Sequence, residues 1–202
     1  MTGFREGGDP VNFNAMKLST FFALGIAVLS LGGRAQAQGQ DQFVYGISGG
    51  VMIPSGLGGD HHKVGPQGSV MAGIGSVDSP FGVRFDVMYG SLGSKTAADT
   101  VKLGEAKVTS VSANLLVRLV GQDERIYFVG GVGGYNYNPN GAGTRATSDF
   151  AVNAGLGIWI PGINGFIEGR WFNMYRALPD PVTGLRGKKS LRIYPISIGL
   201  MF

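Results

Sequence analysis

The chain has 202 residues, among them 36 glycines and no cysteine, and it carries a formal net charge of +4. The lack of cysteine excludes a disulfide framework and thiol catalysis. The small basic surplus is spread along the chain and indicates no nucleic-acid partner, and the length suggests a single domain.

The N-terminal part predicts an export signal. Met16 and Lys17 form the positively charged start of the signal. An apolar run at 18–31 follows it, and the small residues at 35–37 fit a cleavage site. The apolar run is shorter than the roughly twenty residues of a membrane-spanning helix. We therefore expect a dispensable or wrongly assigned extension at 1–15, a cleaved secretory signal peptide at 16–37 and one mature domain at 38–202.

The mature part shows eight segments in which apolar residues alternate with small or polar ones, each bounded by turn-forming residues. Most of these segments approach the length of about ten residues that a tilted strand needs to cross a bilayer. The predicted strands are 43–53, 67–76, 82–91, 107–119, 126–137, 148–160, 165–176 and 191–202.

The predicted connections alternate between long and short. The long ones are 54–66, 92–106, 138–147 and 177–190, and the short ones are 77–81, 120–125 and 161–164. Membrane barrels of the outer-membrane type have long external loops, tight periplasmic turns and an even number of strands. The sequence therefore predicts an all-β fold, an eight-stranded antiparallel transmembrane β-barrel with up-and-down meander topology and both termini on the periplasmic side.

The last predicted strand shows which face meets lipid. Tyr194, Ile196, Ile198, Leu200 and Phe202 lie on one face, and small or mixed residues lie on the other. A soluble carrier of lipocalin type would have the opposite polarity, apolar inside and polar outside. Aromatic residues gather towards the strand ends, as in the interfacial girdles of membrane proteins.

Five charged residues fall on the less apolar face, which we expect to line the lumen. A buried charge is costly unless it is paired. We therefore predict a structural network of ion pairs inside the barrel, with a gated ion path as the functional alternative. Its members are Arg84, Asp86, Arg118, Glu168 and Arg170.

Four segments carry a resemblance to a known family, the small OmpA/OmpX-type outer-membrane β-barrel domains. They are 126–135 (IYFVGGVGGY), 150–157 (FAVNAGLG), 166–171 (FIEGRW) and 196–202 (ISIGLMF). The resemblance covers essentially all of 38–202. It implies an outer-membrane location, no enzymatic activity, and recognition of the last strand by the barrel-assembly machinery, with Phe202 as the key position.

Other candidate sites have simple explanations. Asp60, His61 and His62 stand together in the first long loop, where we expect solvated side chains, because a metal site needs three or four ligands. Lipid A-modifying chemistry would need a histidine with a serine and an acid at the barrel rim. We predict no catalytic, cofactor-binding or metal-binding residues.

Basic residues in or beside two external loops could contact the phosphates of lipopolysaccharide, although ordinary solvation also explains them. These residues are Lys95, Lys102, Lys107, Arg186, Lys188 and Lys189. The sequence thus predicts a barrel with a role in membrane integrity, adhesion or recognition. The alternatives are a narrow ion or small-solute channel, a lipid A-modifying enzyme and a soluble carrier.

Overall fold

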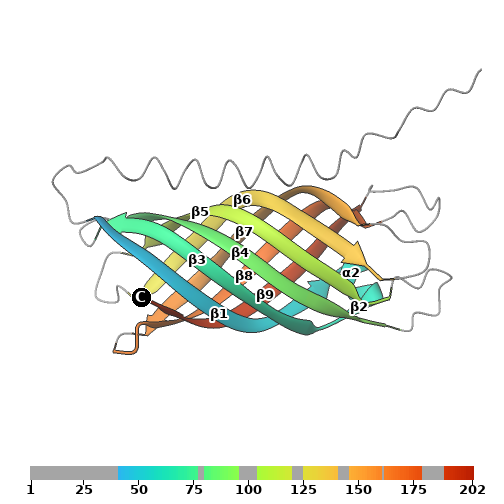
Figure 1. Ribbon diagram of the computed structural model, residues 1–202, viewed down its shortest axis with the longest axis horizontal. Helices are drawn as coiled ribbons and strands as arrows, with labels where there is room; N and C mark the ends of the chain where they lie inside the picture. Colours follow the sequence, from blue (N-terminus) through green and yellow to red (C-terminus); the bar gives the residue numbers. More distant parts are fainter. Residues whose placement is uncertain are drawn as a thin grey trace, which may run out of the picture. The chain divides into compact units, whose positions relative to one another are not determined.

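The computed structural model describes residues 41–76, 80–95, 104–119, 125–140, 146–160, 162–178 and 189–202. The predicted extension and signal peptide lie outside these ranges. Eight long strands dominate the described part of the chain (Figure 1). They are β1 (Asp41–Ser55), β3 (Gly65–Ser76), β4 (Phe81–Ser94), β5 (Ala106–Arg118), β6 (Ile126–Pro139), β7 (Thr147–Ile160), β8 (Gly165–Leu178) and β9 (Lys189–Met201).

The eight long strands form a closed antiparallel barrel. Each pairs with the next along the chain, and β1 pairs with β9 from Gly46↔Met201 to Ser55↔Arg192. Closure pairs the two strands that would otherwise be sheet edges, and an unpaired edge is expensive in lipid. The predicted eight-stranded up-and-down barrel is therefore confirmed, with all eight expected segments forming strands.

The two ends of the barrel differ. One end, called here the turn end, carries the connections 77–80, 119–125 and 161–164 together with the start of β1 and the end of β9. The other, called the loop end, carries the remaining four connections. The predicted alternation of lengths is imperfect, since 119–125 is as long as 140–146. The reason is that β6 continues to Pro139, which still pairs with Ala106.

The first long connection is partly ordered, unlike the plain loop that the sequence predicts. It contains a short helix, α2 (Leu57–His61), and a two-residue strand, β2 (His62–Lys63), which pairs with β4 at Ser94 and Gly93. Both elements lie at the loop end (Figure 1). Gly56, with a φ of 57°, supplies the left-handed turn that redirects the chain from β1 into α2. In the described part of the chain, no helix is long and apolar enough to cross a membrane.

The outer surface of the barrel is apolar along every strand. Because successive side chains alternate between the two faces, one apolar set per strand points outward. These exposed residues include Ile47 and Val51 on β1, Val70 on β3, Val87 on β4, Leu115 on β5, Val132 on β6, Leu156 on β7, Ile167 on β8 and Ile198 on β9. This belt has no protein partner in the described structure.

Phe202 continues the closing pair of strands by one residue. Its N–H donates to the carbonyl of Tyr45 at 2.7 Å, and its own carbonyl accepts from the N–H of Tyr45 at 3.1 Å. The two rings stack on the outer surface with centroids 5.7 Å apart. The last residue therefore extends the β1–β9 pairing at the turn end and adds an aromatic pair to the surface.

Candidate functional site in the barrel lumen

Charged side chains from two strands meet in the middle of the lumen. Arg84 and Asp86 point inward from β4, and Glu168 and Arg170 point inward from β8. Both pairs have i, i+2 spacing, which places their members on the same face of a strand. We call these four residues the charge ring.

The charge ring alternates in sign around a closed circuit. Arg84 contacts Asp86 through Nε and Oδ1 at 2.9 Å, and Glu168 through Nη2 and Oε2 at 2.9 Å. Arg170 contacts Asp86 through Nη2 and Oδ2 at 2.6 Å, and it also pairs with Glu168 through Nε and Oε1. Arg84 is only 1% exposed. Each arginine therefore bridges both carboxylates, and the buried charges sum to zero.

Neutral side chains complete the hydrogen bonding of the charge ring. Tyr127 donates its hydroxyl to Glu168 Oε2 at 2.8 Å, and Asn114 donates its amide to Asp86 Oδ2 at 2.9 Å. Asn153 in turn donates to Asn114 Oδ1 at 2.8 Å. These three residues were not among the predicted members of the network. Their inward position in the period-two alternation was the available signal.

Arg118, which the sequence analysis assigned to the network, does not join the charge ring. It belongs to the inward-facing series of β5, but it is the last residue of that strand and is exposed at the turn end. An arginine at the rim keeps its hydration and needs no buried partner. The structure thus brings together four of the five predicted residues.

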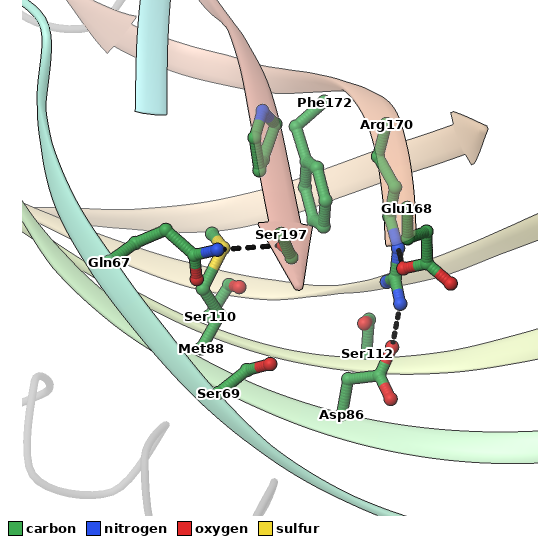
Figure 2. Close-up of a pocket in the computed structure, with 11 residues that line it drawn as sticks. Gln67, Ser69, Asp86, Met88, Ser110, Ser112, Glu168, Arg170, Phe172 and Ser197 are labelled. Atoms are coloured by element: carbon green, nitrogen blue, oxygen red, sulfur yellow. Dashed lines mark hydrogen bonds and ion pairs between the residues drawn. The ribbon is translucent and has the colours of Figure 1, made fainter. Parts of the chain in front are cut away.

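A small polar cavity adjoins the charge ring (Figure 2). Its volume is about 20 Å³, which is room for about one water molecule. Gln67 donates to Ser197 Oγ across it at 2.8 Å, and serines 69, 110 and 112 also line it. The cavity is thus polar, and its size suits a single water molecule.

Much of the lumen near the loop end is apolar, in contrast to the small, charged interior that the sequence predicts. Seven of the eight long strands contribute inward-facing hydrophobic residues near the loop end, and β3 contributes the polar Gln67 instead. The hydrophobic residues form one buried cluster of Met52, Met88, Leu92, Ala106, Val108, Tyr135, Tyr137, Ala151, Phe172, Met174, Leu191 and Ile193. We call it the apolar chamber.

The outer belt and the lumen together identify the environment of the barrel. Apolar side chains cover the exterior, and the buried charges lie paired inside. In a soluble barrel such an exterior would face water, whereas in a bilayer it faces hydrocarbon. The chain folds as an eight-stranded outer-membrane β-barrel. Eight strands leave an interior that side chains just fill, as in the small OmpA/OmpX-type barrels.

No family model and no curated protein sequence matches the chain. Among solved structures, it is similar to Ail of Yersinia pestis in complex with the heparin analogue sucrose octasulfate, with 16% identity, a TM-score of 0.47, and coverage of 82% of this chain and 100% of that chain. It is also similar to Neisserial surface protein A, with 16% identity, a TM-score of 0.47, and coverage of 79% and 94%. A third is OprG of Pseudomonas aeruginosa, with 15% identity, a TM-score of 0.46, and coverage of 83% and 99%.

His62 is not the solvated loop residue that the sequence predicts. It is fully buried, and its Nε2 forms a hydrogen bond of 2.7 Å with the hydroxyl of Tyr137, a residue of the apolar chamber. The pairing of β2 with β4 turns His62 inward, and Lys63 faces solvent. The His62–Tyr137 contact thereby holds α2 and β2 at the loop end.

Acidification should loosen α2 and β2. Burial lowers the pKa of His62, which lies outside the membrane-spanning segments, from 6.5 to about 4. The released segment binds a proton more readily than the closed one. The stabilisation is therefore complete above pH 6.5 and is lost as the pH falls towards 4, by at most about 3 kcal/mol. Hydrogen exchange of residues 57–63 should accelerate between pH 7 and pH 4.5, after correction for intrinsic rates.

The matched control for this prediction is His62→Gln, which keeps a hydrogen-bonding group for Tyr137 but does not titrate in this range. Its corrected exchange rates should be independent of pH. An equal acceleration in the wild type and in His62→Gln would show that another group controls the segment.

The basic residues of the external loops are only partly within the described structure. Lys95 donates its ammonium to the carbonyl of Gly59 and its N–H to the carbonyl of His61 at 3.0 Å, so it ties the start of the second loop to α2. Lys107 and Lys189 lie at the loop ends of β5 and β9. Lys102, Arg186 and Lys188 lie outside the described residues. At the same end, Arg192 of β9 is exposed on the outward face.

Proposed function

We propose that this barrel has a structural and surface-interaction role in the outer membrane, without catalysis and without a permanent pore. The observation that carries the proposal is the filled lumen. The charge ring is internally neutral, and both of its carboxylates are held by arginines. Paired charges of this kind stabilise a narrow barrel, but they offer no free nucleophile or base.

The runner-up is a narrow channel, and the charge ring is the feature that a channel would use. Ion permeation would require opening the contacts of Arg84 and Arg170 with Asp86 and Glu168. The adjoining cavity of about 20 Å³ has room for a single water molecule but not for a hydrated ion. A closed, structural ring is therefore the better interpretation.

Planar bilayers test this interpretation. We expect the purified barrel to give no discrete conductance steps above the background of the bilayer. Glu168→Gln, which removes one charge of the ring, should not create steps either. Steps in the wild type that disappear in Glu168→Gln would establish the channel, because they would depend on a lumen carboxylate.

Two exposed basic residues at the rim of the loop end, called here the rim cations, support a contact with lipopolysaccharide. Lys107 and Arg192 are exposed on the outward face at the loop end, where the phosphates of outer-leaflet lipid A lie. Each cation near an anionic lipid surface contributes about 1 kcal/mol of attraction. Contact with these phosphates would help to fix the depth of the barrel in the membrane.

Neutralising both rim cations should weaken the binding of lipopolysaccharide. We expect Lys107→Ser with Arg192→Ser to reduce the affinity of the detergent-folded barrel roughly thirtyfold, from the loss of two surface attractions of about 1 kcal/mol each. Isothermal titration with purified lipopolysaccharide measures this. Arg118→Ser removes an exposed cation at the turn end instead, and should change nothing. Equal losses in the two variants would indicate a general charge effect.

Phe202 is the proposed recognition point for the barrel-assembly machinery. Its ring is exposed beside Tyr45, and its backbone continues the β1–β9 pairing. An exposed aromatic at the end of the closing strand is accessible to an assembly factor before the barrel closes. This role rests on the family resemblance together with that position.

A further inference from the structure

The pairing between β7 and β8 stops before either strand ends. The last paired residues towards the loop end are Ala151 and Met174, although β7 begins at Thr147 and β8 continues to Leu178. On its other side, the pairing of β8 with β9 becomes irregular between Met174 and Leu178. At its loop end, β8 therefore has no regular hydrogen-bonded ladder with either β7 or β9.

The next pair in register would be Phe150 and Tyr175, which would exchange backbone hydrogen bonds. In an antiparallel ladder, such pairs alternate with pairs that share none. The β8–β9 ladder omits Arg170 and Trp171, and in register Arg170 stands opposite Pro195, which lacks an N–H. This omission indicates that the backbone of Arg170 faces β9. The backbones of odd-numbered residues of β8, including Tyr175, consequently face β7.

Side chains replace one of the two hydrogen bonds that this pair would make, the one from the N–H of Phe150 to the carbonyl of Tyr175. The N–H of Phe150 donates to Asp149 Oδ1 at 2.8 Å, and the hydroxyl of Tyr135 donates to the carbonyl of Tyr175. An unpaired N–H or carbonyl costs several kcal/mol in lipid. Because each of these groups has a side-chain partner, β7 and β8 can separate here without leaving either group unpaired.

The seam between 147–150 and 175–178 separates two apolar regions. On the outside, Phe150 and Tyr175 are 46% and 41% exposed, and their rings stack with centroids 6.0 Å apart. On the inside lie Ala151, Phe172 and Met174 of the apolar chamber. The chamber contains three methionines, whose flexible side chains repack readily around a guest.

We propose that this seam opens sideways and admits a lipid acyl chain from the outer leaflet into the apolar chamber, a binding site beyond the structural role proposed above. The seam lies near the loop end, where outer-leaflet lipid surrounds the barrel. The charge ring limits how deeply a chain can penetrate. Above the chamber, the contact between His62 and Tyr137 holds β2 at the mouth, so that the lateral route favours a membrane lipid over a water-borne solute.

Photo-crosslinking tests the proposal. The full barrel is reconstituted with a phosphatidylethanolamine that carries a diazirine on one acyl chain, irradiated and analysed by peptide mass spectrometry. We expect adducts on lumen residues Met174 and Leu191 in addition to lipid-facing residues such as Ile198. Residues on the outer surface serve as the internal reference for yield.

A disulfide across the seam provides the decisive comparison, because the chain has no cysteine of its own. Oxidised Phe150→Cys with Tyr175→Cys should lose at least four-fifths of the lumen adducts and keep those on Ile198. The control, Val152→Cys with Asn173→Cys, joins a pair inside the intact ladder and should keep both. Absence of lumen adducts in the wild type, or their persistence in the oxidised seam variant, would overturn the proposal.

Discussion

Replacing Arg84 with methionine should lower the free energy of unfolding by about 3–5 kcal/mol, because breaking a buried ion pair leaves an uncompensated charge. Arg84 is 1% exposed and contacts both carboxylates of the charge ring. The variant would leave Asp86 and Glu168 with Arg170 as the only cation of the ring. Urea unfolding in phospholipid vesicles, followed by the fluorescence of Trp159 and Trp171, measures the change.

Two further variants distinguish the effect of the lost ion pairs from the effect of removing an arginine side chain. Arg118→Met removes an exposed arginine at the turn end and should leave the unfolding curve unchanged. Arg84→Met combined with Glu168→Gln makes the ring neutral again and should recover about half of the loss, since no unpaired charge remains. If Arg84→Met changed the free energy of unfolding no more than Arg118→Met does, the charge ring would contribute nothing to stability.

The fold followed from the sequence because period-two alternation determines both the strand positions and their faces. Ile196, Ile198 and Leu200 were expected on the outer face, and they are exposed there. The alternation also placed Arg84 and Glu168 inside, where they meet. Their contact joins strands far apart in the chain, and closure with a particular stagger sets which inward residues share a level.

Several features of the lumen depend on information that alternation does not hold. The alternation placed Arg118 among the inward-facing residues of its strand, but it could not show that the strand ends at this residue. The alternation also does not show at which level of the lumen Leu191 and Ile193 lie, so the apolar chamber was missed. His62 was missed because a two-residue strand has no period to detect. Its burial follows from the pairing of β2 with β4.

Among the glycines beside the charge ring, Gly157 should be the least tolerant of a larger side chain. It faces the lumen from β7, and a Cβ built there meets the ring of Tyr127 well inside van der Waals distance. We expect Gly157→Val to displace Tyr127 and to break its hydrogen bond of 2.8 Å with Glu168. Overpacking and the lost bond to a charged group together predict a destabilisation of about 3 kcal/mol in the same vesicle assay.

Gly169→Val is the matched control, because it introduces the same side chain one strand away. Gly169 of β8 pairs with Leu156 of β7, and a Cβ added at Gly169 has no atom within 4 Å. It points to lipid, where a valine adds apolar surface and favours the extended backbone, so that its stability should be unchanged or slightly higher. Equal destabilisation by the two valines would mean that strand propensity outweighs lumen packing. A loss confined to Gly157→Val, and abolished when Tyr127→Ala makes room for the valine, would show that the space beside Tyr127 allows only glycine.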